Sequence, residues 1–297
     1  MSARGEEVDG VMLLDKPLGL SSNAALQRVR RLVNAKKAGH TGTLDPLATG
    51  LLPLCFGNAT KYSADLLNAD KGYAARVRLG ETTPSGDAES EVTERREVNV
   101  TLPALMDAAL RFTGEIEQVP PMYSAIKVNG RALYRLARAG ESVEREPRRV
   151  TVKRLEVSDF DGRDFTMTCL VSKGTYIRVL AEDIGRSLGC GAHLLSLRRT
   201  SVGDLSVGDA VTMEQIESAG SPEAARKLLK GADALLKSLP EVRLGETDAS
   251  RLMSGQRLAL RLTIRGLVRV YGPENKLLGT AKVNDRGVLE PERLIAH

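Results

Sequence analysis

The apolar residues of this chain recur at every second position in several stretches, which is typical of strands with one buried face. From 73 to 79 the odd positions are apolar or aromatic, while Arg76 and Arg78 occupy even positions. Mainly apolar runs at 10–15 and 51–56 predict buried strands. Further strands are predicted at 150–157, 165–171 and 194–202.

Other stretches carry apolar residues three or four positions apart, as one face of a helix does. Helices are predicted at 21–33, 58–67, 103–112, 130–139 and 177–188. Ser21, Ser22 and Asn23 offer side chains that can cap the first of these helices. Glycine or proline interrupts residues 36–50 four times, so this stretch is predicted to be a loop.

The order of these elements predicts the fold class. Asp161-Gly162 separates two predicted strands, as a hairpin turn does. Because hairpin signals outnumber strand–helix–strand crossovers, we predict an α+β fold with a mixed, mainly antiparallel sheet and flanking helices. Short strands at 267–271, 277–283 and 288–289 predict a small β-rich tail. We therefore expect a main domain over 1–240 and a second domain over 246–297.

Composition and charge narrow the class of protein. Of the 297 residues, 43 are Lys or Arg and 38 are Asp or Glu, which gives a net charge of +5. This balance is compatible with a polyanionic partner without requiring one. No apolar run approaches the ~20 residues of a membrane span, and no signal peptide is visible, so no membrane association is expected. Cys55, Cys169 and Cys190 are too scattered for a disulfide framework, which predicts a reducing, cytoplasmic location.

The common cofactor motifs are missing. The sequence contains neither a G-x-x-x-x-G-K-[ST] phosphate loop nor a G-x-G-x-x-G fingerprint. His40, His193 and His297 have no convincing metal-ligand spacing. We therefore expect no metal and no cofactor, and chemistry performed by carboxylate, hydroxyl or guanidinium groups.

Asp45 is an isolated acid in a basic stretch. No acidic residue lies between Asp15 and Asp45, whereas six basic residues do. Nearby cations favour the ionised carboxylate, and the surrounding glycines allow another chain to approach closely. Such a carboxylate suits a nucleophile that acts on a polyanion. The residues alone are also compatible with an Asp that caps a turn before Pro46.

The stretch around Asp45 resembles a known signature. Gly39-His-Thr-Gly-Thr-Leu-Asp-Pro-Leu-Ala-Thr-Gly-Leu-Leu-Pro53 is similar to the catalytic motif of the TruB family, synthases that isomerise uridine 55 in the T-loop of tRNA to pseudouridine. Five further stretches resemble family motifs and occur in the family's order. They are Gly10–Pro17 with Ser21-Ser-Asn, Lys71-Gly-Tyr73, Val119–Lys127, Ser172–Arg178 and Leu188–Thr200.

The resemblance implies a catalytic set and a fold. Asp45 matches the catalytic nucleophile, and Arg178 matches the arginine that pairs with it. Tyr73 matches the tyrosine that stacks on the target uracil and has been proposed to accept the C5 proton. The implied fold is that of pseudouridine synthases, with a PUA-like RNA-binding domain at the end of the chain. Whether Asp45 attacks C1′ or C6, or assists elimination to a glycal, stays open.

The resemblance also implies residues that bind or support the substrate. Tyr176 and Leu197 match positions that line the uracil pocket, together with Tyr73. His40 matches the histidine that contacts the flipped nucleotides. Lys16 and Pro17 match a motif that supports the active-site loop. Taken singly, each of these residues would more often be an ordinary core, capping or surface residue.

A basic segment begins at the end of the stretch Val119–Lys127. Residues 127–149 contain seven basic and three acidic residues, a net charge of +4, with Tyr123 and Tyr134 in or beside them. Basic residues with interleaved aromatics suit phosphate contact and base stacking, although a solvated helical face would look similar. The candidate RNA-binding residues are Lys127, Arg131, Arg135 and Arg138.

The predicted partner is tRNA, contacted at the stem-loop of the T-arm, and the chain is expected to act as a monomer. A non-catalytic tRNA-binding or tRNA-folding module is the alternative, because it would need the same basic surface but not Asp45. A synthase for rRNA is disfavoured, since the rRNA families share the Asp within a different surrounding motif.

Overall fold

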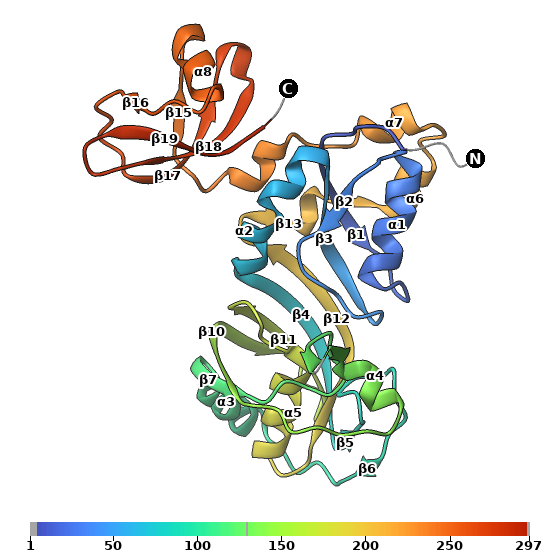
Figure 1. Ribbon diagram of the computed structural model, residues 1–297. Coiled ribbons are helices and arrows are strands. Elements are labelled where there is room, and N and C mark those ends of the chain that lie inside the picture. Colours follow the sequence, from blue (N-terminus) through green and yellow to red (C-terminus); the bar gives the residue numbers. More distant parts are fainter. Residues whose placement is uncertain (1–4, 129, 296–297) are drawn as a thin grey trace.

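The computed structural model of the protein describes residues 5–128 and 130–295, without the side chains at positions 65 and 138. Two sheets dominate it (Figure 1). The larger sheet runs through the body of the molecule, and strands β4 and β12 extend from its upper into its lower half. The smaller sheet, coloured orange to red, forms a separate unit beside the upper half.

Ten of the described strands form the large sheet, in the order β14-β1-β3-β12-β4-β11-β10-β7, with β2 beside β3 and β13 beside β12. Only the pairs β1–β14 and β3–β12 are parallel. The predicted α+β fold with a mixed, mainly antiparallel sheet is confirmed. The strands are β1 (Gly10–Lys16), β2 (Ala38–His40), β3 (Ala48–Phe56), β4 (Lys71–Leu79), β7 (Gly114–Gln118), β10 (Arg148–Ser158), β11 (Asp164–Val171), β12 (Ala192–Val202), β13 (Leu205–Ser206) and β14 (Val211–Thr212).

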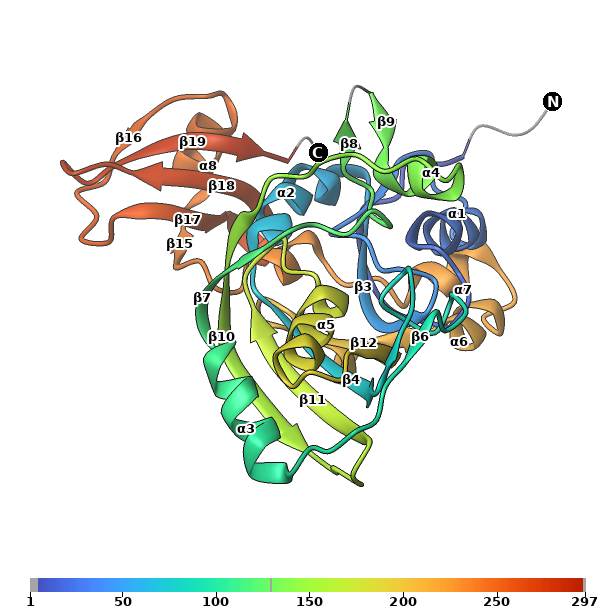
Figure 2. The same cartoon turned by 90° about the horizontal axis from the view of Figure 1, so that it is seen from below.

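Helices cover the sheet (Figure 2), with α5 packed on β12 and α3 on β10. Local signals begin several of them. The Ser21 side chain accepts a hydrogen bond from the Ala24 N–H, and Thr101 caps α3 in the same way. The helices of the body are α1 (Ser22–Leu32), α2 (Ser63–Asn68), α3 (Leu102–Arg111), α4 (Leu133–Arg138), α5 (Ile177–Ser187), α6 (Met213–Glu217) and α7 (Pro222–Arg226), with 3₁₀ turns η1 (Gly57–Tyr62), η2 (Val207–Asp209) and η3 (Ala232–Leu236).

Three predicted elements differ from the structure. The predicted loop 36–50 contains strand β2 and the start of β3, because β2 pairs with β3 in the sheet. The helix predicted at 58–67 is a 3₁₀ turn followed by the short α2. The helix predicted at 130–139 starts only at Leu133, because β8 (Lys127–Val128) and β9 (Arg131–Ala132) form a hairpin first. Asn129-Gly130 is a strong signal for a two-residue hairpin turn, and the helical spacing obscured it.

The smaller sheet has the order β15-β17-β18-β19-β16 and contains the three strands predicted in the tail. Strand β15 pairs with β17 in parallel, so the sheet begins before residue 246. It is tied to the body by the Tyr62 hydroxyl, which donates to the Arg293 carbonyl at 2.9 Å, and by Ile295, which is buried against η1 and η3 residues. Its elements are β15 (Glu241–Arg243), α8 (Glu246–Met253), β16 (Leu258–Ala259), β17 (Gly266–Tyr271), η4 (Pro273–Asn275), β18 (Leu277–Val283) and β19 (Val288–Leu294). A further two-stranded pair, β5 (Glu81–Thr82) with β6 (Glu94–Arg95), lies on the body.

One row of residues crosses five neighbouring strands of the large sheet. Lys16 lies opposite Gly50, Gly50 opposite Arg199, Arg199 opposite Tyr73, and Tyr73 opposite Cys169. Directly opposite residues share a face, so the row places side chains from β1, β12 and β4 side by side. Gly50 has a φ of 97°, and a Cβ there would lie 2.3 Å from the Arg199 carbonyl oxygen. Only glycine allows the two strands to approach this closely.

Replacing Gly50 therefore has a predictable cost. Gly50→Ala combines a left-handed backbone with a backbone clash, and we expect it to lower the free energy of unfolding by at least about 2 kcal/mol. Gly39→Ala is the matched control, because a Cβ at position 39 would meet nothing within 4 Å and the φ there is not left-handed. Urea unfolding of both variants tests this. Equal stability of Gly50→Ala and wild type would contradict the close approach of β3 to β12.

Candidate active site

Asp45 lies between β2 and β3, and its side chain is 38% exposed. Hydrogen bonds from α1 and from the connection between β1 and α1 fix the backbone on each side of Asp45. Ser22 at the start of α1 accepts from the Leu44 N–H at 2.7 Å and donates to the Leu44 carbonyl at 3.0 Å. The Gly19 N–H donates to the Pro46 carbonyl at 2.8 Å. These bonds hold a carboxylate at the surface on a loop that is itself rigid.

Lys16, predicted to support this loop together with Pro17, lies beneath it. Lys16 is fully buried and donates to the carbonyl oxygens of Pro17 at 2.9 Å and Leu20 at 2.6 Å, with a longer contact to Pro46 at 3.5 Å. Burial lowers the pKa of Lys16 to about 8, although the charge of Asp45 opposes that shift. The lysine therefore fixes the β1–α1 connection, and its contact to Pro46 links that connection to the Asp45 loop.

Arg178, in the first turn of α5, makes an ion pair with Asp45. Its Nη2 atom lies 2.9 Å from Asp45 Oδ2 and also donates to the Tyr123 carbonyl at 2.7 Å. Its Nη1 atom donates to the Ser85 carbonyl at 2.6 Å. The guanidinium is only 5% exposed, so these bonds leave it one orientation, with one edge turned toward Asp45.

Asp87 is a member of this arrangement that the sequence reasoning missed. Its side chain is 2% exposed, and its Oδ2 lies 3.6 Å from Arg178 Nε. Its Oδ1 accepts from the Ser85 hydroxyl at 2.5 Å and from the Glu89 N–H at 3.1 Å. A buried carboxylate behind Arg178 compensates the buried positive charge and fixes the guanidinium from the far side. Pro84-Ser-Gly-Asp87 has the composition of an ordinary turn, so no local pattern signals this role.

Tyr73 and Leu197 lie on the face of the sheet described by the cross-strand row. Leu197 lies opposite Ala75, two residues from Tyr73, and both Tyr73 and Leu197 are 8% exposed. Burial raises the pKa of Tyr73, and the charge of Asp45 acts in the same direction, whereas Arg199 lowers it through its charge and a hydrogen bond. Tyr73 is therefore within electrostatic reach of both groups.

Tyr176 and His40 complete the surroundings. Gln118 fixes the Tyr176 backbone by accepting from its N–H at 3.0 Å and donating to its carbonyl at 3.3 Å. Burial raises the pKa of Tyr176, and the Asp45 charge adds to this shift. Burial and the nearby Arg199 charge lower the pKa of His40, which favours the neutral ring. Its Nδ1 is buried and has no hydrogen-bond partner among the described residues.

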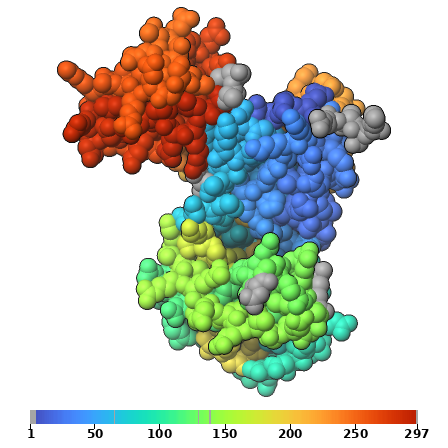
Figure 3. Space-filling view, in the orientation of Figure 1, coloured from blue at the N-terminus to red at the C-terminus, as the bar shows by residue number. Residues whose placement is uncertain are grey.

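The predicted RNA-binding residues lie away from this cluster. Lys127, Arg131 and Arg135 are exposed on the β8–β9 hairpin and α4, on the lower part of the molecule (Figure 3). Arg131 pairs with Glu141 at 3.0 Å, and Arg135 donates to the Tyr134 hydroxyl at 3.3 Å. The side chain of Arg138 lies outside the described residues. The segment is joined to the cluster through Tyr123, whose carbonyl accepts from Arg178.

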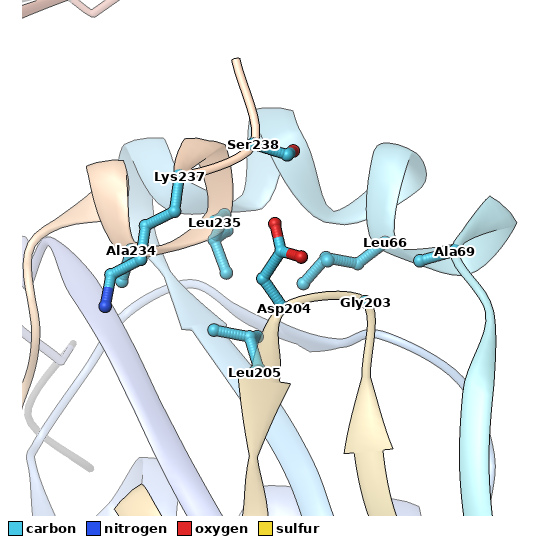
Figure 4. A pocket seen from close by; sticks show the side chains of 9 residues that line it. All are labelled: Leu66, Ala69, Gly203, Asp204, Leu205, Ala234, Leu235, Lys237 and Ser238. Atoms are coloured by element: carbon cyan, nitrogen blue, oxygen red, sulfur yellow. The ribbon is translucent and has the colours of Figure 1, made fainter. Parts of the chain in front are cut away.

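Other features of the described residues do not add to this cluster. A shallow hollow between α2, the β12–β13 turn and η3 contains Asp204 and Lys237, but no predicted site residue lines it (Figure 4). Within the described chain, no group of three or more His, Cys, Asp or Glu side chains is arranged to hold a metal ion. None of the described helices is long and apolar enough to cross a membrane.

Comparison with family models agrees with this geometry. Residues 30–177 match the N-terminal domain of the TruB family of pseudouridylate synthases. Residues 178–237 match the tRNA pseudouridylate synthase B C-terminal domain, and residues 240–295 match the C-terminal domain of pseudouridine synthase II TruB. Consecutive family models thus cover most of the chain.

Curated relatives match over nearly the whole length. A protein of Cupriavidus metallidurans named tRNA pseudouridine synthase B is 57% identical over 299 residues, which cover 97% of this chain and 95% of the relative. A protein of Dechloromonas aromatica with the same name is 53% identical over 290 residues, covering 98% of this chain and 96% of the relative.

Solved structures share the fold. A chain in a structure of an H/ACA RNP bound to a substrate RNA containing 2′-deoxyuridine has a TM-score of 0.73 and 25% identity, over 97% of this chain and 85% of that chain. A chain in a Cbf5-Nop10-Gar1 complex has a TM-score of 0.71 and 26% identity, over 96% of this chain and 84% of that chain. From the motifs, the matching family models and the identity of its relatives, the chain belongs to the TruB family of pseudouridine synthases.

Proposed function

We propose that this protein isomerises uridine 55 in the T-loop of tRNA to pseudouridine. The observation that carries the proposal is the ion pair of Asp45 with Arg178 at 2.9 Å, next to Tyr73, Tyr176 and Leu197. The name tRNA pseudouridine synthase B, carried by relatives that are 53–57% identical, supports the reaction and the tRNA substrate. The RNA-bound H/ACA structure supports an RNA substrate for this fold.

The reaction is an isomerisation. The C1′–N1 bond of uridine breaks, a C1′–C5 bond forms, C5 loses a proton, and N1 gains one. A uridine in a folded loop has to leave the stack first, at roughly a few kcal/mol. Its base would then enter the space beside Asp45, where Tyr73, Tyr176 and Leu197 offer aromatic and apolar surface. Exclusion of water by this surface would keep the detached base in place.

The chain's own residues take distinct roles in this proposal. Asp45 supplies the nucleophilic or eliminating carboxylate, and Arg178 orients it by a charge-assisted hydrogen bond. Asp87 holds Arg178 from behind. Tyr73 stacks on the base and is the candidate to accept its C5 proton. His40, whose ring is only partly buried, contacts a flipped nucleotide.

Two basic regions are proposed to bind the rest of the T-arm. The first is the 127–149 segment, with a net charge of +4. The second is the C-terminal β domain, which we place from residue 241 because β15 belongs to its sheet. We propose that the protein acts as a monomer, since every residue of the site comes from one chain. We also propose that it works in the cytoplasm, where tRNA is processed.

Replacement of Asp45 separates catalysis from binding. Asp45→Asn keeps the size of the side chain but removes its charge and nucleophilicity, so pseudouridine formation should be abolished. Binding of tRNA should stay within about tenfold, equivalent to ~1.4 kcal/mol. Pseudouridine mapping and filter binding on an unmodified transcript measure both quantities. The control is Asp204→Asn, the same change at an exposed carboxylate on the β12–β13 turn, which should leave both unchanged. Turnover by Asp45→Asn would exclude the nucleophile and favour a capping role.

The basic segment gives a prediction on salt dependence. Charge reversal of Arg131, Arg135 and Arg138 to Glu should weaken tRNA binding and flatten its dependence on salt, by up to ~0.9 in slope for each lost phosphate contact. Reversal of Arg111, Arg154 and Arg186, which are exposed on α3, β10 and α5, changes the net charge equally and serves as the control. An unchanged affinity and slope in the first variant would mean that the segment is only a solvated face.

The C-terminal domain should matter more for intact tRNA than for an isolated hairpin. Sequence-specific readout usually concerns single-stranded loops, so a T-arm stem-loop should be modified, at a lower rate than whole tRNA. A chain ending after Leu239 should lose more rate on tRNA than on the hairpin. The ratio of the two rates, with and without the domain, is the measurement, and thermal unfolding checks that the shortened body still folds. An equal loss on both substrates would indicate general structural support instead.

A further inference from the structure

Arg199 on β12 is a buried guanidinium that the proposed roles leave unused. Its side chain is 1% exposed, and it is the largest of the fully buried side chains among the described residues. No described carboxylate lies within 4.0 Å of it, in contrast to Arg178. Burial of an unpaired charge costs free energy of folding, so a buried arginine without a carboxylate partner indicates a role for its charge or its hydrogen bonds at that position.

The hydrogen bonds of Arg199 converge on the Asp45 loop. Its Nη2 donates to the Gly42 carbonyl at 3.2 Å and its Nη1 to the Thr43 carbonyl at 3.4 Å, three and two residues before Asp45. Its Nε donates to the Leu51 carbonyl at 2.7 Å, on the strand after the loop. One side chain therefore clamps both ends of the segment that carries the carboxylate.

The same guanidinium reaches the active-site tyrosine. Strand β12 lies between β3 and β4, and Arg199 is directly opposite both Gly50 and Tyr73. Because Gly50 has no side chain, the Arg199 guanidinium can extend toward the loop, while Tyr73 lies directly opposite Arg199 on the neighbouring strand β4. The groups that act electrostatically on Tyr73 are Arg199, Cys169 and Asp45.

We propose that Arg199 is a positioning residue that fixes the Asp45 loop and the Tyr73 hydroxyl relative to each other. The proposal rests on the proposed function, because these are the two groups that would contact the flipped uridine. The planar fork of arginine can donate to several acceptors at once in fixed directions, which the single ammonium of lysine cannot do.

The neighbouring Arg198 provides a matched control. It is one residue along the same strand, points to the opposite face, and donates in a bidentate manner to Asp15 at 3.0 and 2.6 Å. Arg198→Lys makes the same change from a planar guanidinium to an ammonium at the neighbouring position of β12. The ion pair that it alters, with Asp15, is partly exposed. The single-turnover rate of this variant should stay within about threefold of wild type.

A double-mutant cycle tests the proposal. Arg199→Lys should lower the single-turnover rate on saturating tRNA by about 100-fold, the loss expected from a small misplacement of reacting groups, with tRNA affinity unchanged. Tyr73→Phe removes the hydroxyl of the residue that lies directly opposite Arg199. In the Tyr73→Phe background the same Arg199→Lys change should cost less than about tenfold, because the two residues act together. Equal losses in both backgrounds would overturn the coupling to Tyr73.

A second measurement covers the case in which Arg199→Lys does not fold, which thermal unfolding would reveal. In wild-type protein labelled with ¹⁵N-arginine, Arg199 should give a guanidinium resonance protected from solvent exchange, and Tyr73→Phe should shift it. The Arg198 resonance should exchange faster and not move. An unprotected Arg199 signal, or one unaffected by Tyr73→Phe, contradicts the proposal. This result does not depend on turnover, so a wild-type protein that forms no pseudouridine would refute the proposed function separately.

Discussion

The contact between Asp45 and Arg178 is the interaction on which the rest of the site depends. A reactive carboxylate has to be exposed to substrate, yet it needs a fixed orientation. An exposed loop by itself provides neither a positive partner for the carboxylate nor a rigid support. Arg178 provides both, because it is buried and every edge of its guanidinium is bound. Asp87 on the far side compensates the charge that this burial would otherwise leave unpaired.

The loop around Asp45 is held by cations bonded to carbonyl groups, with few ion pairs. Lys16 on β1 contacts the Pro46 carbonyl at 3.5 Å, and Arg199 on β12 binds those of Gly42, Thr43 and Leu51. Carbonyl partners satisfy the donors without cancelling the charge, so the positive field around the carboxylate is kept. The same field would attract the phosphates of an RNA substrate. The same side chains thus fix the loop and supply positive charge beside the proposed RNA site.

Local signals predicted the elements whose patterns do not depend on distant residues. The alternation from 73 to 79 became β4, and the serines at 21–23 begin α1 through the Ser21 cap. The prediction of one helix over 130–139 is wrong at its start, because the apolar spacing from Leu133 does not extend backward over Asn129-Gly130. Residues 38–40 show no strand pattern, because three residues are too few for an alternation to be recognised. They form a strand because they pair with β3.

Contiguous motifs and local periodicity were enough to predict the fold class, the family resemblance and the identity of Asp45, Tyr73 and Arg178. Successive side chains of a strand point to opposite faces of the sheet, so the adjacent residues Arg198 and Arg199 of the predicted strand have to lie on different faces. Which of the two is buried, and that Asp87 stands behind Arg178, became visible only in the folded chain. Those relations join residues that are 91 and 149 positions apart. Strand order and register bring Gly50 to Arg199, whereas the packing of α5 against the turn that carries Asp87 brings Arg178 to that carboxylate.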